Sequence, residues 1–292
     1  GMLMDVLRFN RSARTMDAHE TMSLRDYCLR ENFGKAFMDD YLVPMAAAIW
    51  STGDAEILDF PMGMLAQFFL HHGLLDLKDR PQWYVVEGGS AQYVKAMAGR
   101  IGSVRTSNAV TNVRRAPDGV YITVGSKIER FDEVVFACHA PQSRSLLEDA
   151  TAAESEILGD MRCSHNTVAL HQDASVMPKH RAVWASWNYH ATQGSTQAGL
   201  TYYMNRLQNF ETTLPVLVTL NEVDSIDPAR LIKTLNYAHP IFDQNMLKAQ
   251  RRHAEISGHQ RTHYCGAYWF NGFHEDGVVS ALRVVREIEA SL

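Results

Sequence analysis

The residues best suited to chemistry lie at the end of the chain, in THYCGAYWFNGFHEDGVVSALRVVREIEASL at residues 262–292. A β-favouring run at 263–270 breaks at Asn271-Gly272, and apolar residues recur at helical spacing after Gly277. This pattern predicts a strand, a turn that needs glycine, and a helix. The N-terminus of a helix carries the positive end of its dipole, so it could hold an anion or an electron-rich ring. A packed terminal helix without a ligand is the alternative.

Other chemistries lack their motifs. The sequence contains no GxSxG, HExxH or P-loop pattern. His259 and His263 have the spacing of a helical metal pair, but they lie where the pattern changes to a strand. His71 and His72 are adjacent, and adjacent side chains on a helix point in different directions. We therefore predict no metal site and assign no catalytic residue.

The stretch CGAYWFNGFHEDGVVSAL resembles the C-terminal flavin-contacting signature of the FAD-dependent amine oxidoreductase superfamily. This superfamily includes monoamine oxidases, protoporphyrinogen oxidases and phytoene desaturases, and the likeness is strongest to a bacterial branch of predicted NAD/FAD-binding proteins. In the family, this strand and turn lie against the cofactor and the helix points its N-terminus at the flavin. The resemblance implies flavin contacts by Gly266, Gly272, Phe273, Gly277 and Val278.

Two internal stretches carry the same resemblance. In PQWYVVEGGSAQYVKAMAGRI (81–101), Gly88, Gly89 and Ser90 stand where the family has a glycine pair that returns the chain to the cofactor domain. Ser90 could also cap the helix that follows. Val110 matches a valine whose backbone contacts the adenine. The resemblance implies that these four residues bind the cofactor.

Aromatic residues with polar tips gather in AVWASWNYH and LTYYMNRLQN, which also match the bacterial branch. Their rings suit the wall of a pocket for a flat ligand, and they equally suit a half-buried sheet face. We expect four of them to border a substrate pocket: Trp187, Tyr189, Tyr203 and Trp269. In the N-terminal region, pocket lining and core packing are alternatives for Met45, Trp50, Phe60, Met62, Phe68 and Phe69.

One part of the family pattern is missing. A complete member begins with a βαβ unit that carries GxGxxG, followed by an acidic residue about 20 residues later. None of the 18 glycines has this spacing, and the first residues already resemble the substrate-side helices. We therefore expect a truncated flavoprotein that is inactive alone and is isolated without stoichiometric FAD.

The elements around these motifs indicate a mixed α/β fold. The resemblance implies part of an FAD/NAD(P)-binding Rossmann-like domain, interleaved with a helical and mixed β-sheet substrate domain. The expected parts are a helical part of the substrate domain at 2–80, an FAD-domain part at 81–142, the substrate-domain sheet and helices at 143–257, and the C-terminal FAD-domain strand, turn and helix at 258–292.

The local pattern makes several further predictions. Ser23 is the expected N-cap of a helix. Residues 83–86 should form a short strand, and the apolar run at 133–138 should be a strand buried in a parallel sheet. The pattern at 227–237 predicts a helix.

Composition limits the function classes. With 292 residues, 46% of them hydrophobic, the chain can bury a sizeable core. A net charge of −5 argues against nucleic-acid binding, and no apolar run approaches the roughly 20 residues of a membrane span. Four cysteines without a CxxC pair fit reduced thiols in a cytoplasmic protein.

The expected function is oxidation of a C–N or C–C bond in a small amine or an apolar or polyene substrate, by hydride transfer to FAD. A non-catalytic flavin- or nucleotide-binding scaffold of the same fold is the alternative. Apolar surface left bare on the strand at 133–138 should favour self-association.

Overall fold

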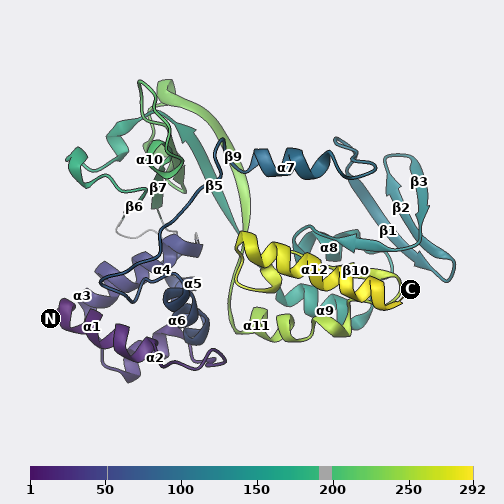
Figure 1. Cartoon of the computed structure of the whole chain (residues 1–292), viewed down its shortest axis with the longest axis horizontal. Helices are drawn as coiled ribbons and strands as arrows, with labels where there is room; N and C mark the ends of the chain where they lie inside the picture. Colours follow the sequence, from purple (N-terminus) through teal and green to yellow (C-terminus); the bar gives the residue numbers. More distant parts are fainter. Residues whose placement is uncertain (51, 191–198, 292) are drawn as a thin grey trace. The chain divides into compact units, whose positions relative to one another are not determined.

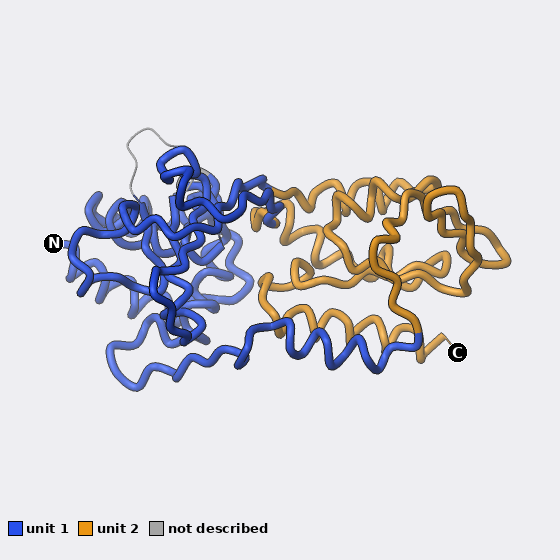
Figure 2. The backbone as a smooth tube through the Cα atoms, turned by 90° about the horizontal axis from the view of Figure 1, so that it is seen from above, with its two compact units in different colours: residues 1–102, 164–239 blue, residues 103–163, 240–292 orange. Residues whose placement is uncertain are grey.

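The computed structural model describes residues 1–50, 52–190 and 199–291, and it divides into two compact units. Unit 1 comprises 1–102 and 164–239, and unit 2 comprises 103–163 and 240–292 (Figure 2). Helices and strands occur in both units, so the prediction of a mixed α/β fold is confirmed. The chain enters each unit twice, as an interleaved arrangement requires. Residues 81–102 lie in unit 1, and residues 143–163 and 240–257 lie in unit 2. The expected division into substrate-domain and FAD-domain parts stays a prediction.

The first part of unit 1 is helical (Figure 1). Aromatic side chains pack against one another in its core. Ser23 caps α2, because its side chain accepts a hydrogen bond from the Asp26 N–H, as predicted. Phe9 is fully buried, and its ring centroid lies 5.6 Å from that of Phe37 and 6.1 Å from that of Phe69. The helices are α1 (Met2–Ala13), α2 (Leu24–Arg30), α3 (Lys35–Phe37), the π-helical η1 (Met38–Leu42), α4 (Val43–Trp50), α5 (Asp54–Leu58) and α6 (Met62–His71).

Residues 81–109 include many apolar side chains, yet none of these residues is buried. Residues 83–86 form no strand, which corrects the prediction, because no described strand lies beside them to pair with their backbone. Helix α7 (Ala91–Ala98) begins where expected, but Ser90 makes no side-chain capping hydrogen bond.

A five-stranded sheet completes unit 1. Its strands follow the order β6 (Trp187–His190), β7 (Gly199–Tyr203), β8 (Leu217–Leu220), β5 (Cys163–His171) and β9 (Leu231–Pro240). β6, β7, β8 and β5 are antiparallel to their neighbours in this order. The helix predicted at 227–237 is wrong: after the short 3-10 turn η5 (Pro228–Arg230) the chain forms β9, because hydrogen bonding to β5 outweighs the local apolar spacing.

Unit 2 contains a three-stranded meander, β1 (Val110–Ala116), β2 (Gly119–Val124) and β3 (Lys127–Phe131). β4 (Val134–Phe136) then pairs in parallel with β10 (Thr262–Tyr264), which confirms the predicted parallel pairing. Burial on both faces was wrong, because Val135 is 42% exposed between two buried neighbours. Only one face of this strand is covered by described residues.

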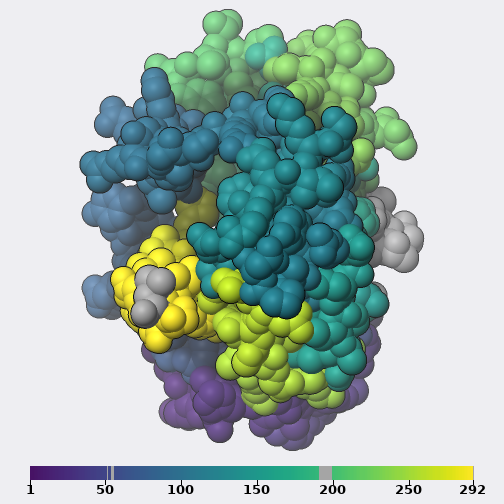
Figure 3. All heavy atoms as spheres, turned by 90° about the vertical axis from the view of Figure 1, so that its right-hand side faces the viewer, coloured from purple at the N-terminus to yellow at the C-terminus, as the bar shows by residue number. Residues whose placement is uncertain are grey.

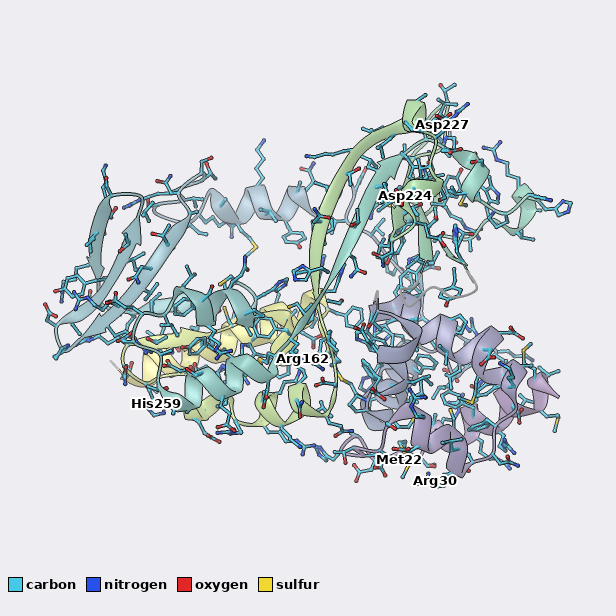
Figure 4. The ribbon with its side chains drawn as sticks, turned by 180° about the vertical axis from the view of Figure 1, so that it is seen from behind. Met22, Arg30, Arg162, Asp224, Asp227 and His259 are labelled. Atoms are coloured by element: carbon cyan, nitrogen blue, oxygen red, sulfur yellow. The ribbon has the colours of Figure 1, made fainter. Side chains whose placement is uncertain are left out.

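Four helices complete unit 2: α8 (Ala140–Leu146), α9 (Ala152–Asp160), α11 (Gln244–Arg251) and α12 (His274–Ser291). α12, yellow in Figure 3, lies at the surface. The two stretches of the unit are joined near Arg162, labelled in Figure 4, whose guanidinium donates to Asp243 at 2.6 Å. The Arg162 carbonyl also accepts a hydrogen bond from the Ile241 N–H at 2.9 Å.

A buried charged group lies at the centre of unit 2. The Arg115 guanidinium donates to Glu154 at 2.5 and 2.9 Å, and the Tyr264 hydroxyl donates to the same carboxylate at 2.7 Å. Arg115 and Glu154 side chains are 3% and 4% exposed. Because both charges are removed from water, this pair must be fully hydrogen-bonded to be tolerated.

Candidate functional site

One pocket of unit 1 has a volume of about 740 Å³, within the range typical of small-molecule sites. Helices α4 and α6, the exposed stretch at 82–85, strand β6 and the short helix α10 (Met204–Leu207) contribute to it. Most of its wall is apolar or aromatic. The lining residues are Met45, Ile49, Phe68, Leu74, Gln82, Trp83, Tyr84, Val85, Ser186, Trp187, Arg206, Leu207 and Asn209.

Of the aromatic residues expected at the pocket, Trp187 lines it. Trp187 lies opposite Tyr202 in the β6–β7 pairing, with ring centroids 5.9 Å apart, and Tyr189 is on the same face of β6. Tyr203 is on the other face of β7, where its ring packs edge-on against Trp184 at 5.3 Å. Tyr203 therefore belongs to the small core that Met177, Trp184 and Leu217 form beneath the sheet.

The N-terminal candidates separate into two groups. Met45 and Phe68 line the pocket. The other four are at most 7% exposed and pack in the helical core: Trp50, Phe60, Met62 and Phe69. Core packing was therefore the better interpretation for the second group.

A second cavity of about 710 Å³ adjoins the first, since Val85 and Asn209 line both. Its wall includes Gly88 and Gly89, two of the predicted cofactor contacts. Both glycines have positive φ, 75° and 82°, and a Cβ added to Gly89 would meet no atom within 4 Å. The backbone at Gly89 is therefore open to close approach by a ligand. Unit 1 thus brings the glycine pair next to the pocket that contains Trp187.

Arg206 is a pocket residue that the sequence interpretation did not single out. Its Nη1 donates to the Trp184 carbonyl oxygen at 2.6 Å, and its side chain is exposed. A single arginine has no diagnostic spacing; its place in TYYMNRLQN, a stretch singled out for its resemblance, was the only available signal.

In unit 2, the C-terminal signature forms β10, the turn η7 (Ala267–Trp269) and α12. Gly266 has φ 146°, and a Cβ there would lie 2.5 Å from the Tyr268 ring, so this position requires glycine. Gly272 also has positive φ. The helix begins at His274, so Gly277 lies within its first turns rather than before it, which corrects the expected turn.

The N-terminus of α12 is not a simple anion-binding site. The Phe273 N–H donates to the Asp276 carboxylate at 2.9 Å, so an acidic side chain already occupies part of this end. Glu275 adds a second acidic residue in the first turn. Gly277 and Val278 remain accessible, since Val278 is 52% exposed and a Cβ at Gly277 would meet nothing within 4 Å.

Trp269 and Val110 occupy different settings in unit 2. Trp269 is 1% exposed, and its ring packs edge-on against His253 at 4.6 Å and beneath the Arg283 guanidinium. Its indole Nε1 is buried and has no hydrogen-bond partner among the described residues. Val110 begins β1, next to an irregularity in its pairing with β2.

The groups next to the signature are held neutral. Burial lowers the pKa of His139, which lies at the start of α8 and packs edge-on against Tyr268. Burial also raises the pKa of Tyr268, whose hydroxyl donates to the Cys138 carbonyl at 3.1 Å. Neither group carries charge near neutral pH, which suits contact with an apolar ring system.

Within 1–50, 52–190 and 199–291, no group of three or more His, Cys, Asp or Glu side chains is arranged to hold a metal ion. Among the helices in these ranges, none has the length and apolar character needed to cross a membrane.

Comparisons with known proteins place this geometry in context. The chain is similar over 99% of its length to cyclohexylamine oxidase from Brevibacterium oxydans IH-35A, with 11% identity, a TM-score of 0.60 and coverage of 75% of that protein. Putrescine oxidase bound to putrescine gives 13% identity and a TM-score of 0.64, covering 99% of this chain and 76% of that one. A conjugated-linoleic-acid-producing fatty acid isomerase from P. acnes gives 13% identity and 0.64, covering 98% and 74%.

At these identities the similarity shows a shared fold, that of FAD-dependent oxidoreductases. No curated protein sequence matches the chain. The family described as "Flavin containing amine oxidoreductase" matches residues 7–161, more than half of the chain. The protein therefore belongs to the flavin-containing amine oxidoreductase family.

Proposed function

We propose that this protein is the substrate-binding part, with part of the cofactor site, of an oxidoreductase that transfers a hydride from a C–N or C–C bond to FAD. The observation that carries this proposal is the adjacency of two cavities in unit 1. One has aromatic walls that include Trp187, and the other exposes the backbone of Gly88 and Gly89. Family membership and the two amine oxidases of similar fold support an amine as the first substrate class to test.

The residues present fit a flavin in part. When bound, FAD would accept the hydride, while the protein binds and orients the substrate and excludes water. The open backbone at Gly89 would allow a flat ring to approach. In unit 2, we propose contacts from Val110, Gly266, Gly272, Phe273, Gly277 and Val278. Ser90, next to the glycine pair, and Tyr189, on the same face of β6 as Trp187, keep their proposed roles, whereas Trp269 is buried in unit 2 and is not proposed as pocket lining.

The chain offers fewer groups that could bind the phosphates of FAD. The 18 glycines form no GxGxxG, and Asp276 already accepts a hydrogen bond at the N-terminus of α12. We propose that this chain is a fragment that is isolated without stoichiometric FAD and is inactive in that state. Loss of even ~4 kcal/mol of phosphate binding lowers affinity about a thousandfold. Four free cysteines support a cytoplasmic setting.

The test uses the isolated chain with excess FAD under anaerobic conditions. Cyclohexylamine, which carries a single ammonium group, is added, and bleaching of the flavin absorbance is followed with FAD alone as a blank. We expect amine-dependent bleaching that is lost in Gly89→Val. Gly258→Val is the matched control, since Gly258 has φ 81° and equally open space for a Cβ.

The outcomes separate the alternatives. FAD binding without reduction by amines or polyenes would favour the non-catalytic scaffold. No binding at any FAD concentration would contradict the flavin assignment, and a preparation isolated with one flavin per chain would contradict the fragment proposal. Self-association through exposed apolar residues such as Val135 is tested by sedimentation of the wild type and Val135→Lys.

A further inference from the structure

The pocket of unit 1 has an uneven distribution of polar groups. Arg206 carries the only charge among the described residues that line it. Gln82, Ser186 and Asn209 supply neutral polar groups, and the remaining described lining is apolar or aromatic. A ligand that fills this pocket therefore meets one positive charge and an apolar wall.

Arg206 is held in place by the sheet and its small core. Its anchor residue, Trp184, is 8% exposed and donates its indole N–H to the Pro178 carbonyl at 2.8 Å. The backbone of α10 is fixed as well, because the Met204 N–H donates to the Val216 carbonyl at 2.9 Å. The guanidinium therefore has a defined position before a ligand binds.

The guanidinium also retains donors for a ligand. Arg206 uses Nη1 to reach Trp184, and no carboxylate among the described residues forms an ion pair with it. Arginine stays protonated at all physiological pH values and presents several N–H groups in a plane. This arrangement matches the two oxygens of a carboxylate.

The charge also excludes other ligand classes. A second ammonium group near Arg206 would be repelled, and no carboxylate in the described lining could receive it. A phosphate carries close to two negative charges and is usually met by more than one cation or by a helix N-terminus. A single guanidinium matches a single carboxylate best.

We propose that this pocket binds a small molecule with an apolar body and one carboxylate, and that Arg206 selects it through that carboxylate. This inference names the substrate class of the proposed oxidoreductase and rests on that function. The bond to be oxidised would then lie in the apolar part, away from Arg206, and Trp83 and Trp187 would enclose that part. Simple diamines would be poor ligands.

The test measures binding, without flavin, by calorimetry with octanoate, octylamine and 1-octanol, which share one alkyl chain. We expect the wild type to bind octanoate more tightly than 1-octanol and octylamine least. Arg206→Gln should weaken octanoate binding by about 10–100-fold and leave 1-octanol unchanged. Arg206→Lys should be intermediate, because it keeps the charge and loses the planar pair of donors.

Arg230→Gln is the control, because Arg230 is an exposed arginine of unit 1 outside the pocket. Circular dichroism of each variant checks folding, since Arg206→Gln removes the bond to Trp184. If Arg206→Gln unfolds, the octanoate affinity of Arg206→Lys is compared with that of the wild type and decides the question. Equal octanoate affinity in the wild type and in a folded Arg206 variant would overturn the inference.

The inference and the proposed function can fail separately. Arg206-dependent octanoate binding without any flavin reduction would contradict the oxidoreductase function while the carboxylate site stands. Flavin reduction by amines with no Arg206-dependent octanoate binding would support the function and overturn the carboxylate site.

Discussion

The helical part of unit 1 and the centre of unit 2 achieve burial in different ways. Around Phe9, aromatic rings pack against one another, with the rings of Tyr27, Phe33, Phe37 and Phe69 within 6.3 Å. At the centre of unit 2, by contrast, a charged arginine and a carboxylate are buried together. The first arrangement gains stability from every buried group, whereas the second is stable only while all partners are present.

Glu154→Gln should give the largest effect. It removes the more buried of the two carboxylates that pair with Arg115 and leaves only Asp149, 3.0 Å away, which costs about 3–5 kcal/mol of unfolding free energy. Hydrogen–deuterium exchange should show the loss in peptides of unit 2. Glu156→Gln is the control, because Glu156 lies on the same helix with its side chain 61% exposed. Similar destabilisation by both variants would remove the distinction between the two cores.

Phe9→Ala should give a comparable loss in the other unit. Removing a fully buried ring leaves a cavity and costs about 3–5 kcal/mol, here seen in exchange of unit 1 peptides. Leu3→Ala, on the same helix and 70% exposed, should change stability by less than about 0.5 kcal/mol. Faster exchange in unit 2 but not unit 1 would contradict this prediction.

Lowering the pH should distinguish the core of unit 1 from that of unit 2 in the wild-type protein, without a mutation. Burial alone would raise the pKa of Glu154, but hydrogen bonds from Arg115, Tyr264 and the Thr151 N–H lower it to about 2 from 4.5. A lowered pKa means that the stabilisation is complete above pH 4.5 and is lost as pH falls towards 2. The free energy of unfolding should fall by about 3 kcal/mol. This fall should appear in unit 2 of the wild type and be absent in Glu154→Gln. An identical acid profile for the two proteins would argue against it.

Gly63→Ala tests close packing in the helical part and should have the smallest effect. A Cβ at Gly63 would lie 2.7 Å from the carbonyl oxygens of Asp17 and Glu20, although a helical glycine usually tolerates alanine. We expect a loss of about 1–3 kcal/mol by urea unfolding. Gly277→Ala, also helical but facing open space, should be neutral or stabilising by up to about 1 kcal/mol. Equal stability of the two variants would show that the backbone near Gly63 adapts.

Much of the local structure could be predicted because short-range physics determines it. The Ser23 cap, the N-terminal helices and the parallel strand follow from capping, helical spacing and a short apolar run. β9 could not be predicted, because Leu231 and Leu235 have helical spacing and only the neighbouring β5 makes the segment a strand. The prediction for residues 83–86 was wrong for the opposite reason: their composition favours a strand, but no described strand pairs with them.

The candidate site was predicted unevenly for the same reason. Glycine pairs and aromatic runs are visible in sequence, so Gly88, Gly89 and Trp187 could be named before the structure placed their cavities side by side. Arg206 could not, because a lone charge acquires meaning only from the apolar wall around it. Composition alone could not show on which face of its strand Tyr203 lies. Because side chains alternate between the two faces of β7, its ring packs in the small core with Trp184.

The exposed stretch at 81–109 also has a practical consequence for handling the protein. Lys95 and Arg100 are exposed and lie among residues of which none is buried, so trypsin should reach them early. A cut there would leave the helices of residues 1–75 on one fragment and the sheet strands of unit 1 on the other, since those strands lie between 163 and 240. The pocket draws its walls from both fragments, so nicked protein should keep ligand binding only while its two pieces stay associated.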